Sequence, residues 1–60
     1  MITMIVKHEL GNMEVSGSTA RKAAERLVAM GIEHATLIEK ERPHTGRVLN
    51  IRNGEIRLVR

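Results

Sequence analysis

The strongest constraint on the fold is the dipeptide Asn53-Gly54, which stands between two segments of alternating apolar and polar residues. Asn-Gly favours a two-residue hairpin turn, because both of its residues accept a positive φ. This turn places Arg52 opposite Glu55, as a pair of opposite charges, and carries the pairing outward to Val48 opposite Val59. The segment therefore predicts a β-hairpin over residues 48–59. Its buried face would hold Leu49, Ile51, Ile56 and Leu58.

The other face of this hairpin is cationic and mixed in character. The last nineteen residues hold five arginines and one glutamate, and so carry all of the net positive charge. Arginine is preferred where planar contact with a carboxylate or phosphate matters, although a charged face also keeps a sheet soluble and blocks edge pairing. We expect Arg47 and Arg60 at the open end of the hairpin on its core side, and Arg42 in the preceding loop. The predicted partner-binding residues are Arg47, Val48, Asn50, Arg52, Arg57, Val59 and Arg60.

Composition narrows the class of protein further. A chain of sixty residues buries only about 60% of its unfolded surface, so self-association or a larger partner would stabilise it. Without cysteine there is no disulfide or thiolate metal site, and without aromatic residues there is no platform for stacked bases. The apolar run Met1–Val6 is too short for a signal peptide or a membrane span. We expect a single cytoplasmic domain, residues 1–60, without membrane contact.

The remaining elements are read from periodicity and turn residues. Residues 2–10 alternate as a strand, and Gly11-Asn12 predicts a turn that sets Met13 and Val15 beside Leu10 and His8. Residues 34–41 predict a third strand, and a loop follows over residues 42–46, where proline lacks the N–H that a ladder needs.

A single helix is predicted between the second and third strands. It would begin after a cap at Ser18 or Thr19 and end before Gly31. Its buried stripe would comprise Ala20, Ala23, Ala24 and Leu27, with Val28 and Met30 at the margins. Free amides after Gly17 would suit an anion, but an ordinary capped helix is the simpler interpretation. The solvent side carries a second basic face of Arg21, Lys22 and Arg26.

The order ββαβββ predicts an α+β fold, with a mainly antiparallel five-stranded sheet and one helix packed on one face. One helix covers only one face. The other face would show Val48, Val59, Ile5 and either Leu37 or Ile38 among the arginines. This pattern is typical of an interaction surface, and equally of aliphatic residues scattered singly over an ordinary protein surface.

Catalytic and metal-binding patterns are missing from the sequence. The serines and threonines have no His-Asp partner at a recognisable spacing. The three histidines, His8, His34 and His44, match no metal-ligand spacing. We therefore expect a protein that is not an enzyme and that uses no metal or other cofactor.

Three segments of the chain together carry a resemblance to a known class of proteins. The strand Met4-Ile5-Val6-Lys7, the helix start at Gly17-Ser18 with Ala20 and Ala24, and the strand start Gly46-Arg47-Val48 carry it. In these segments the chain resembles small phage anti-CRISPR proteins built as a five-stranded sheet with one helix. The resemblance implies a non-enzymatic inhibitor that docks on a host nucleoprotein complex, in the host cytoplasm.

Two functions follow from these observations. The first is docking on a protein or nucleoprotein partner with an acidic surface, through the arginine-rich sheet face. The alternative is a small regulator that binds DNA or another double-stranded nucleic acid with the C-terminal hairpin. Arg52, Arg57 and Asn50 would then read bases in the major groove, and a symmetric homodimer would supply enough contact area. The backbone would be held by Arg21, Lys22 and Arg26.

Overall fold

In the computed structural model, which describes residues 1–60, the Asn53-Gly54 hairpin forms in the predicted register. Strands β4 (Val48–Arg52) and β5 (Glu55–Leu58) pair antiparallel, from Arg52 opposite Glu55 to Leu49 opposite Leu58. Both turn residues have the positive φ that the turn requires, 53° at Asn53 and 76° at Gly54.

The open end of this hairpin differs from the prediction. The carbonyl oxygen of Val48 accepts from the N–H groups of both Val59, at 2.8 Å, and Arg60, at 3.3 Å. The N–H of Val48 donates to the carbonyl oxygen of Arg60 at 3.0 Å. Two residues therefore face one, which is a β-bulge and not the simple Val48–Val59 pair.

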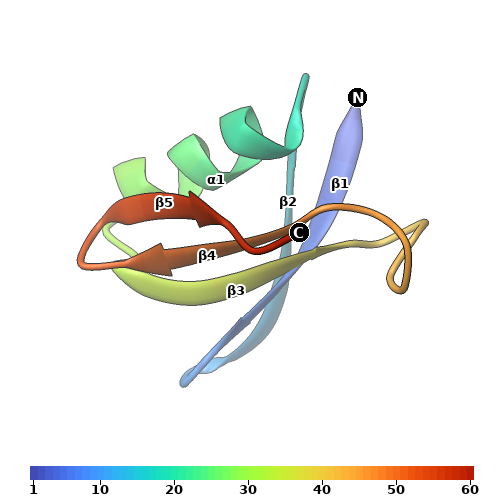
Figure 1. Cartoon of the computed structure of the whole chain (residues 1–60). Coiled ribbons are helices and arrows are strands. Elements are labelled where there is room, and N and C mark those ends of the chain that lie inside the picture. The colour runs from blue at the N-terminus through green and yellow to red at the C-terminus, as the bar shows by residue number, and fades with distance from the viewer.

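The other strands complete a five-stranded antiparallel sheet with the order β2-β1-β3-β4-β5 (Figure 1). Strand β1 (Ile2–His8) lies between β2 (Gly11–Gly17) and β3 (His34–Glu39), so the N-terminal hairpin joins the rest through β1. One helix, α1 (Ala20–Ala29), packs on one face. The predicted α+β fold is confirmed.

The first hairpin forms in a different register from the predicted one. Its turn lies at Glu9 and Leu10, so that Met4 faces Val15 and Val6 faces Met13. Gly11 follows the turn with a φ of 120°, a conformation that suits glycine. This register pairs the whole of β1 with β2, whereas a turn at Gly11-Asn12 would leave the buried Met4 without a cross-strand partner. Because the two registers differ by an even number of residues, the same side chains face the core in both.

The helix begins and ends as its sequence predicts. Thr19 is the cap, and its side-chain oxygen accepts from the N–H of Lys22 at 3.1 Å. Gly31, with a φ of 92°, follows the last turn; its N–H donates to Val28, and that of Ile32 to Leu27. The buried stripe is Ala20, Ala23, Ala24 and Leu27.

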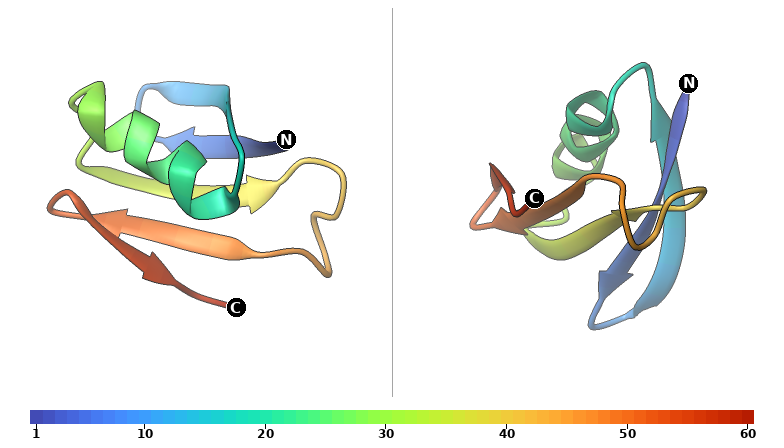
Figure 2. Two further views of the ribbon diagram at one scale, coloured as in Figure 1. Left: turned by 90° about the horizontal axis from the view of Figure 1, so that it is seen from above. Right: turned by 45° about the vertical axis from the view of Figure 1, so that its right-hand side comes forward.

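Small side chains let the helix lie close to the sheet. A Cβ atom at Gly17, where β2 ends, would come within 2.6 Å of the backbone nitrogen of Ala23. The fully buried side chains of Met4, Val6, Leu27 and Leu37 form the centre of the core. In both views of Figure 2 the helix lies on the β1 and β2 side of the sheet and leaves β5 largely uncovered. Leu58 of β5 is accordingly 57% exposed.

Candidate functional site

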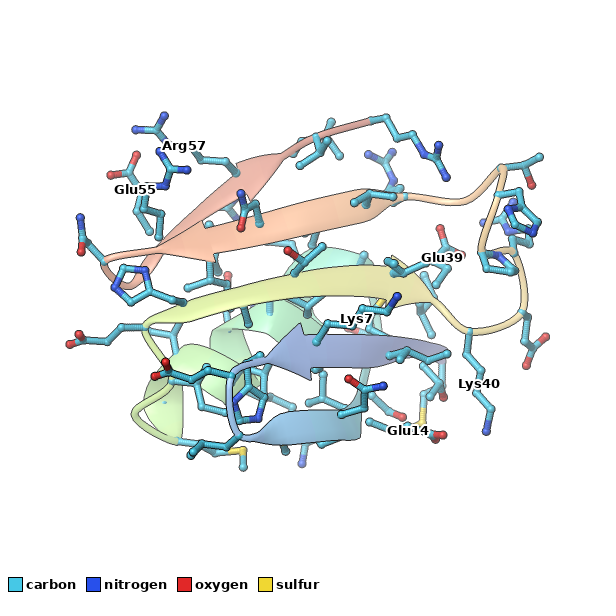
Figure 3. The ribbon with its side chains drawn as sticks, turned by 90° about the horizontal axis from the view of Figure 1, so that it is seen from below. Lys7, Glu14, Glu39, Lys40, Glu55 and Arg57 are labelled. Carbon is cyan, nitrogen blue, oxygen red and sulfur yellow. The ribbon has the colours of Figure 1, made fainter.

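The sheet face opposite α1, here called the open face, is covered by no other element (Figures 1 and 3). Paired residues on neighbouring strands point to the same side, so the register defines rows across this face. Ile5 faces Ile38, and Ile38 faces Val48, which makes one row of three half-buried aliphatic side chains. We call these three residues the aliphatic row.

A polar and cationic row runs beside the aliphatic row. It is formed by Lys7, Thr36, Asn50 and Arg57, which face one another in turn on β1, β3, β4 and β5. Beyond it, Arg52 lies between His34 and Glu55. The open face thus combines contiguous apolar surface with fixed positive charge, a combination typical of an interaction surface.

The acidic groups of the open face are already paired. Glu14 lies 3.1 Å from the Nζ of Lys40, and Glu55 lies 3.3 Å from Arg57. Figure 3, which looks onto the open face, shows these two ion pairs at opposite corners, with Lys7 between them. Lys7 and Arg52 have no acidic partner. Glu55 lies opposite Arg52 in the register, as predicted, but its ion pair is with Arg57 on its own strand.

The structure divides the predicted partner-binding residues into two groups. Val48, Asn50, Arg52 and Arg57 lie on the open face, and the bulge holds Val59, which is 60% exposed, beside Val48. The other two line a separate hollow at the end of the sheet. This arginine hollow is lined by Glu39, Arg42, Thr45, Gly46, Arg47 and Arg60.

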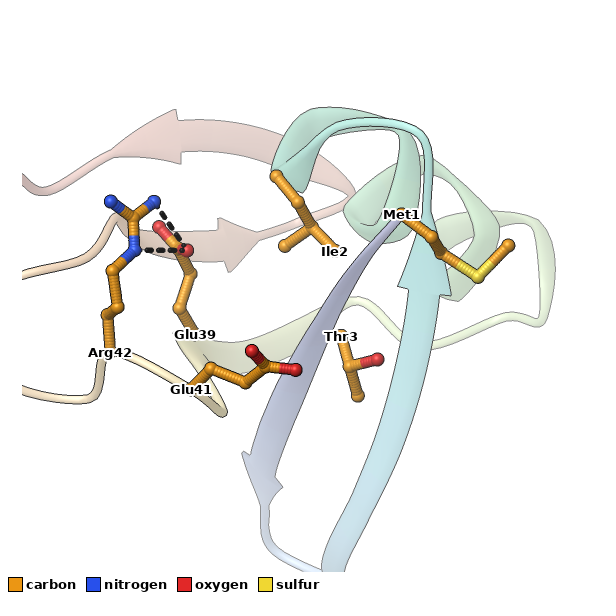
Figure 4. Close-up of a pocket in the computed structure, with 6 residues that line it drawn as sticks. All are labelled: Met1, Ile2, Thr3, Glu39, Glu41 and Arg42. Carbon is orange, nitrogen blue, oxygen red and sulfur yellow. Dashed lines mark hydrogen bonds and ion pairs between the residues drawn. The ribbon is translucent and has the colours of Figure 1, made fainter.

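Glu39 organises the arginine hollow. It is the only buried charged residue and is 5% exposed. One carboxylate oxygen accepts from Nη2 and Nε of Arg42, at 2.9 and 3.3 Å (Figure 4). The other accepts from the N–H of Arg47. These donors, the Arg47 N–H first, hold the pKa of Glu39 below its ordinary value. Gly46 is required beside it, since a Cβ there would lie 2.7 Å from the carboxylate.

The sequence contained signals for residues that the predictions missed. Alternation places Glu39 on the core face two residues after Leu37, and a buried carboxylate demands donors, which the loop supplies. The sequence pattern places Arg42 in the loop, and in the structure this residue lines the same hollow as Arg47 and Arg60. Of the two residues proposed for the open face, Ile38 lies there and Leu37 is buried. The pairing of β1 with β3, which brings Ile5 and Lys7 into the rows, has no local signal.

The second basic face on α1 is partly neutralised. Arg21 and Lys22 both lie near Glu25, at 3.7 and 3.6 Å. Arg26 reaches back to β2, where its Nη1 donates to the carbonyl oxygen of Ser16 at 3.0 Å. The helix that carries these residues lies on the face of the sheet opposite the open face (Figure 1).

Two further features bear on metal and membrane contact. His8 and His34 line one shallow hollow, together with Glu9 and Glu33. No group of three or more His, Cys, Asp or Glu side chains is placed to hold a metal ion. No helix has the length and apolar character that crossing a membrane would require.

Comparison with known proteins leaves the open face and the arginine hollow as the basis for assigning function. No protein-family pattern, curated protein sequence or solved structure matches this chain.

Proposed function

We propose that the protein is a non-enzymatic binding protein that docks on an acidic protein or nucleoprotein surface through its open face. The observation that carries this proposal is the aliphatic row, Ile5, Ile38 and Val48, placed in register and left uncovered beside the polar row that holds Lys7, with Arg52 beyond that row. An apolar patch bordered by unpaired cations fits a partner that offers an apolar pocket and carboxylates nearby. The resemblance to small phage anti-CRISPR proteins supports an inhibitor that acts on such a complex in the host cytoplasm.

Duplex binding through the same hairpin has weaker support. A phosphate-binding surface gains affinity from concentrated positive charge, yet the open face also carries Glu14 and Glu55. Arg57, one of the proposed base readers, is engaged by Glu55. Aliphatic side chains add little to a contact with a charged backbone but much to a protein interface.

The test is capture of a partner from a lysate of the natural host, with and without nuclease. Val48→Thr removes apolar contact but retains the shape of a β-branched side chain, and Arg52→Gln removes charge. We expect nuclease-resistant capture that each substitution weakens by about tenfold, which is the effect of 1.4 kcal/mol. The captured protein is then identified, and its binding is measured with purified components.

Arg21→Gln, on the helix side, is the matched control, because it removes the same charge from outside the open face. Docking through the open face predicts no change in affinity for this variant. Capture that disappears with nuclease, weakens in Arg21→Gln and falls steeply with salt would favour the duplex regulator. Unchanged capture by both Val48→Thr and Arg52→Gln would refute docking through this face.

A further inference from the structure

We propose that the arginine hollow is a second binding site, separate from the open face, and that it takes a phosphate group carrying two negative charges. The hollow lies at the end of the sheet, where β3 leaves, β4 begins and the bulged end of β5 returns. None of its lining residues is hydrophobic.

Three segments bring an arginine to the lining of this hollow. Arg42 comes from the loop after β3, Arg47 from the start of β4, and Arg60 from the bulge after β5. Arg60 is held there because its Nη2 donates to the carbonyl oxygen of Pro43 at 3.1 Å. Three like charges repel one another, and a bound anion would relieve that repulsion.

The buried carboxylate of Glu39 does not neutralise all three of these arginines. Both oxygens of Glu39 are occupied by donors from Arg42 and from the backbone of Arg47. The charge of Glu39 offsets that of Arg42, so Arg47 and Arg60 remain without an acidic partner. The guanidinium of Arg47 makes no hydrogen bond, and Arg60 retains Nε and Nη1 as free donors.

The unmatched charge and the arrangement of donors favour phosphate over carboxylate. The three arginines exceed the single carboxylate of Glu39 by two positive charges, which match a dianion, whereas a carboxylate carries one charge and two oxygens. Fork-shaped donors arriving from separate segments suit a group with three terminal oxygens. The hydroxyl of Thr45, also in the lining, adds a neutral donor. A phosphodiester, with one charge, fits less well than inorganic phosphate or a phosphomonoester.

The experiment is an NMR titration of the full chain, ¹⁵N-labelled, with inorganic phosphate, phenyl phosphate or dimethyl phosphate at constant ionic strength. We expect saturable shifts of the Gly46 and Arg47 amides with the first two compounds, with a dissociation constant on the order of 1 mM. Whichever of the two binds more tightly identifies the source, free phosphate or the phosphorylated end of a larger molecule. Dimethyl phosphate should bind at least about tenfold more weakly.

Arg47→Gln tests the site without disturbing its frame, because the backbone N–H that holds Glu39 remains. We expect this variant to bind inorganic phosphate about tenfold more weakly, and Arg52→Gln, on the open face, to bind it as the wild type does. The dispersion of the amide signals in the same spectra reports that each variant is folded. A linear response without saturation, equal affinity in Arg47→Gln, or equal affinity for dimethyl phosphate would overturn the proposal. Partner capture through the open face is unaffected by any of these results.

Discussion

The helix lies close against the end of β2 at Gly17, and Gly17→Ala tests the placement of α1. The backbone there has no positive φ, so alanine meets no conformational penalty of its own. The added Cβ would lie 2.6 Å from the backbone nitrogen of Ala23 and 3.0 Å from the carbonyl carbon of Lys22. Ordinary contact begins near 3.4 Å, so the helix must retreat by about 0.8 Å. Backbone atoms cannot rotate away as a side chain can.

The magnitude follows from two opposing effects on the free energy of unfolding. Overpacking of this kind costs about 1–3 kcal/mol. Replacing glycine with alanine raises the free energy of unfolding by about 0.4–1 kcal/mol, because it reduces the conformational entropy of the unfolded chain. Taken near the middle of each range, the two effects give a net loss of about 1–2 kcal/mol, against a total stability of about 3–9 kcal/mol for a domain of this size. The corresponding decrease in Tm is about 4–16 °C.

Thermal and urea denaturation followed by circular dichroism measure this loss. Ser18→Ala, at the exposed neighbouring residue, should change the free energy of unfolding by less than about 0.5 kcal/mol. Adding Ala23→Gly to Gly17→Ala should not restore stability, because the clash is with the backbone of Ala23 and not with its methyl group. A Gly17→Ala variant as stable as the wild type would refute the close packing of α1 on β2.

Two further predictions concern the loop and the helix cap. In Glu39→Gln one terminal amide nitrogen must face a donor from Arg42 or Arg47, so the variant should be less stable at neutral pH. Because folding lowers the pKa of Glu39, its contribution is fully present above about pH 4.5, the ordinary value, and is lost as pH falls through the folded pKa. Urea midpoints of the two proteins should therefore converge in acid; a constant difference down to pH 2 would contradict this account. Thr19→Ala removes the acceptor for the Lys22 N–H and should cost about 1 kcal/mol, whereas Thr19→Ser should retain most of the stability. Calorimetry of both Thr19 variants checks this prediction. A Thr19→Ala variant with the same melting temperature as the wild type would show that the cap contributes nothing.

The two hairpins show how far a local pattern can be followed. At Asn53-Gly54 both turn residues accept positive φ, and only one register agrees with the alternation on either side. At Gly11 the glycine was identified, but its place relative to the turn was not. Local geometry allowed more than one register there, and the length of pairing between β1 and β2 decided between them.

The candidate sites were predicted in part, for the same reason. The hairpin pattern was sufficient to put Val48, Asn50, Arg52 and Arg57 on one face. It could not show that Ile5 and Lys7 extend that face, because β1 and β3 are joined only in the tertiary structure. The bulge that holds Arg60 near Pro43 also departs from strict alternation.

The sequence alone therefore determined the elements whose signals lie within a few residues: the C-terminal hairpin, the helix with its alanine stripe, and the cationic character of the last third. Turn preference, capping and periodicity act over short distances, so they can be read without coordinates. The tertiary structure decided the strand order, the aliphatic row, and the gathering of Arg42, Arg47 and Arg60 around Glu39. Those features depend on contacts between distant segments and on the need of one buried carboxylate for donors, which no local pattern specifies.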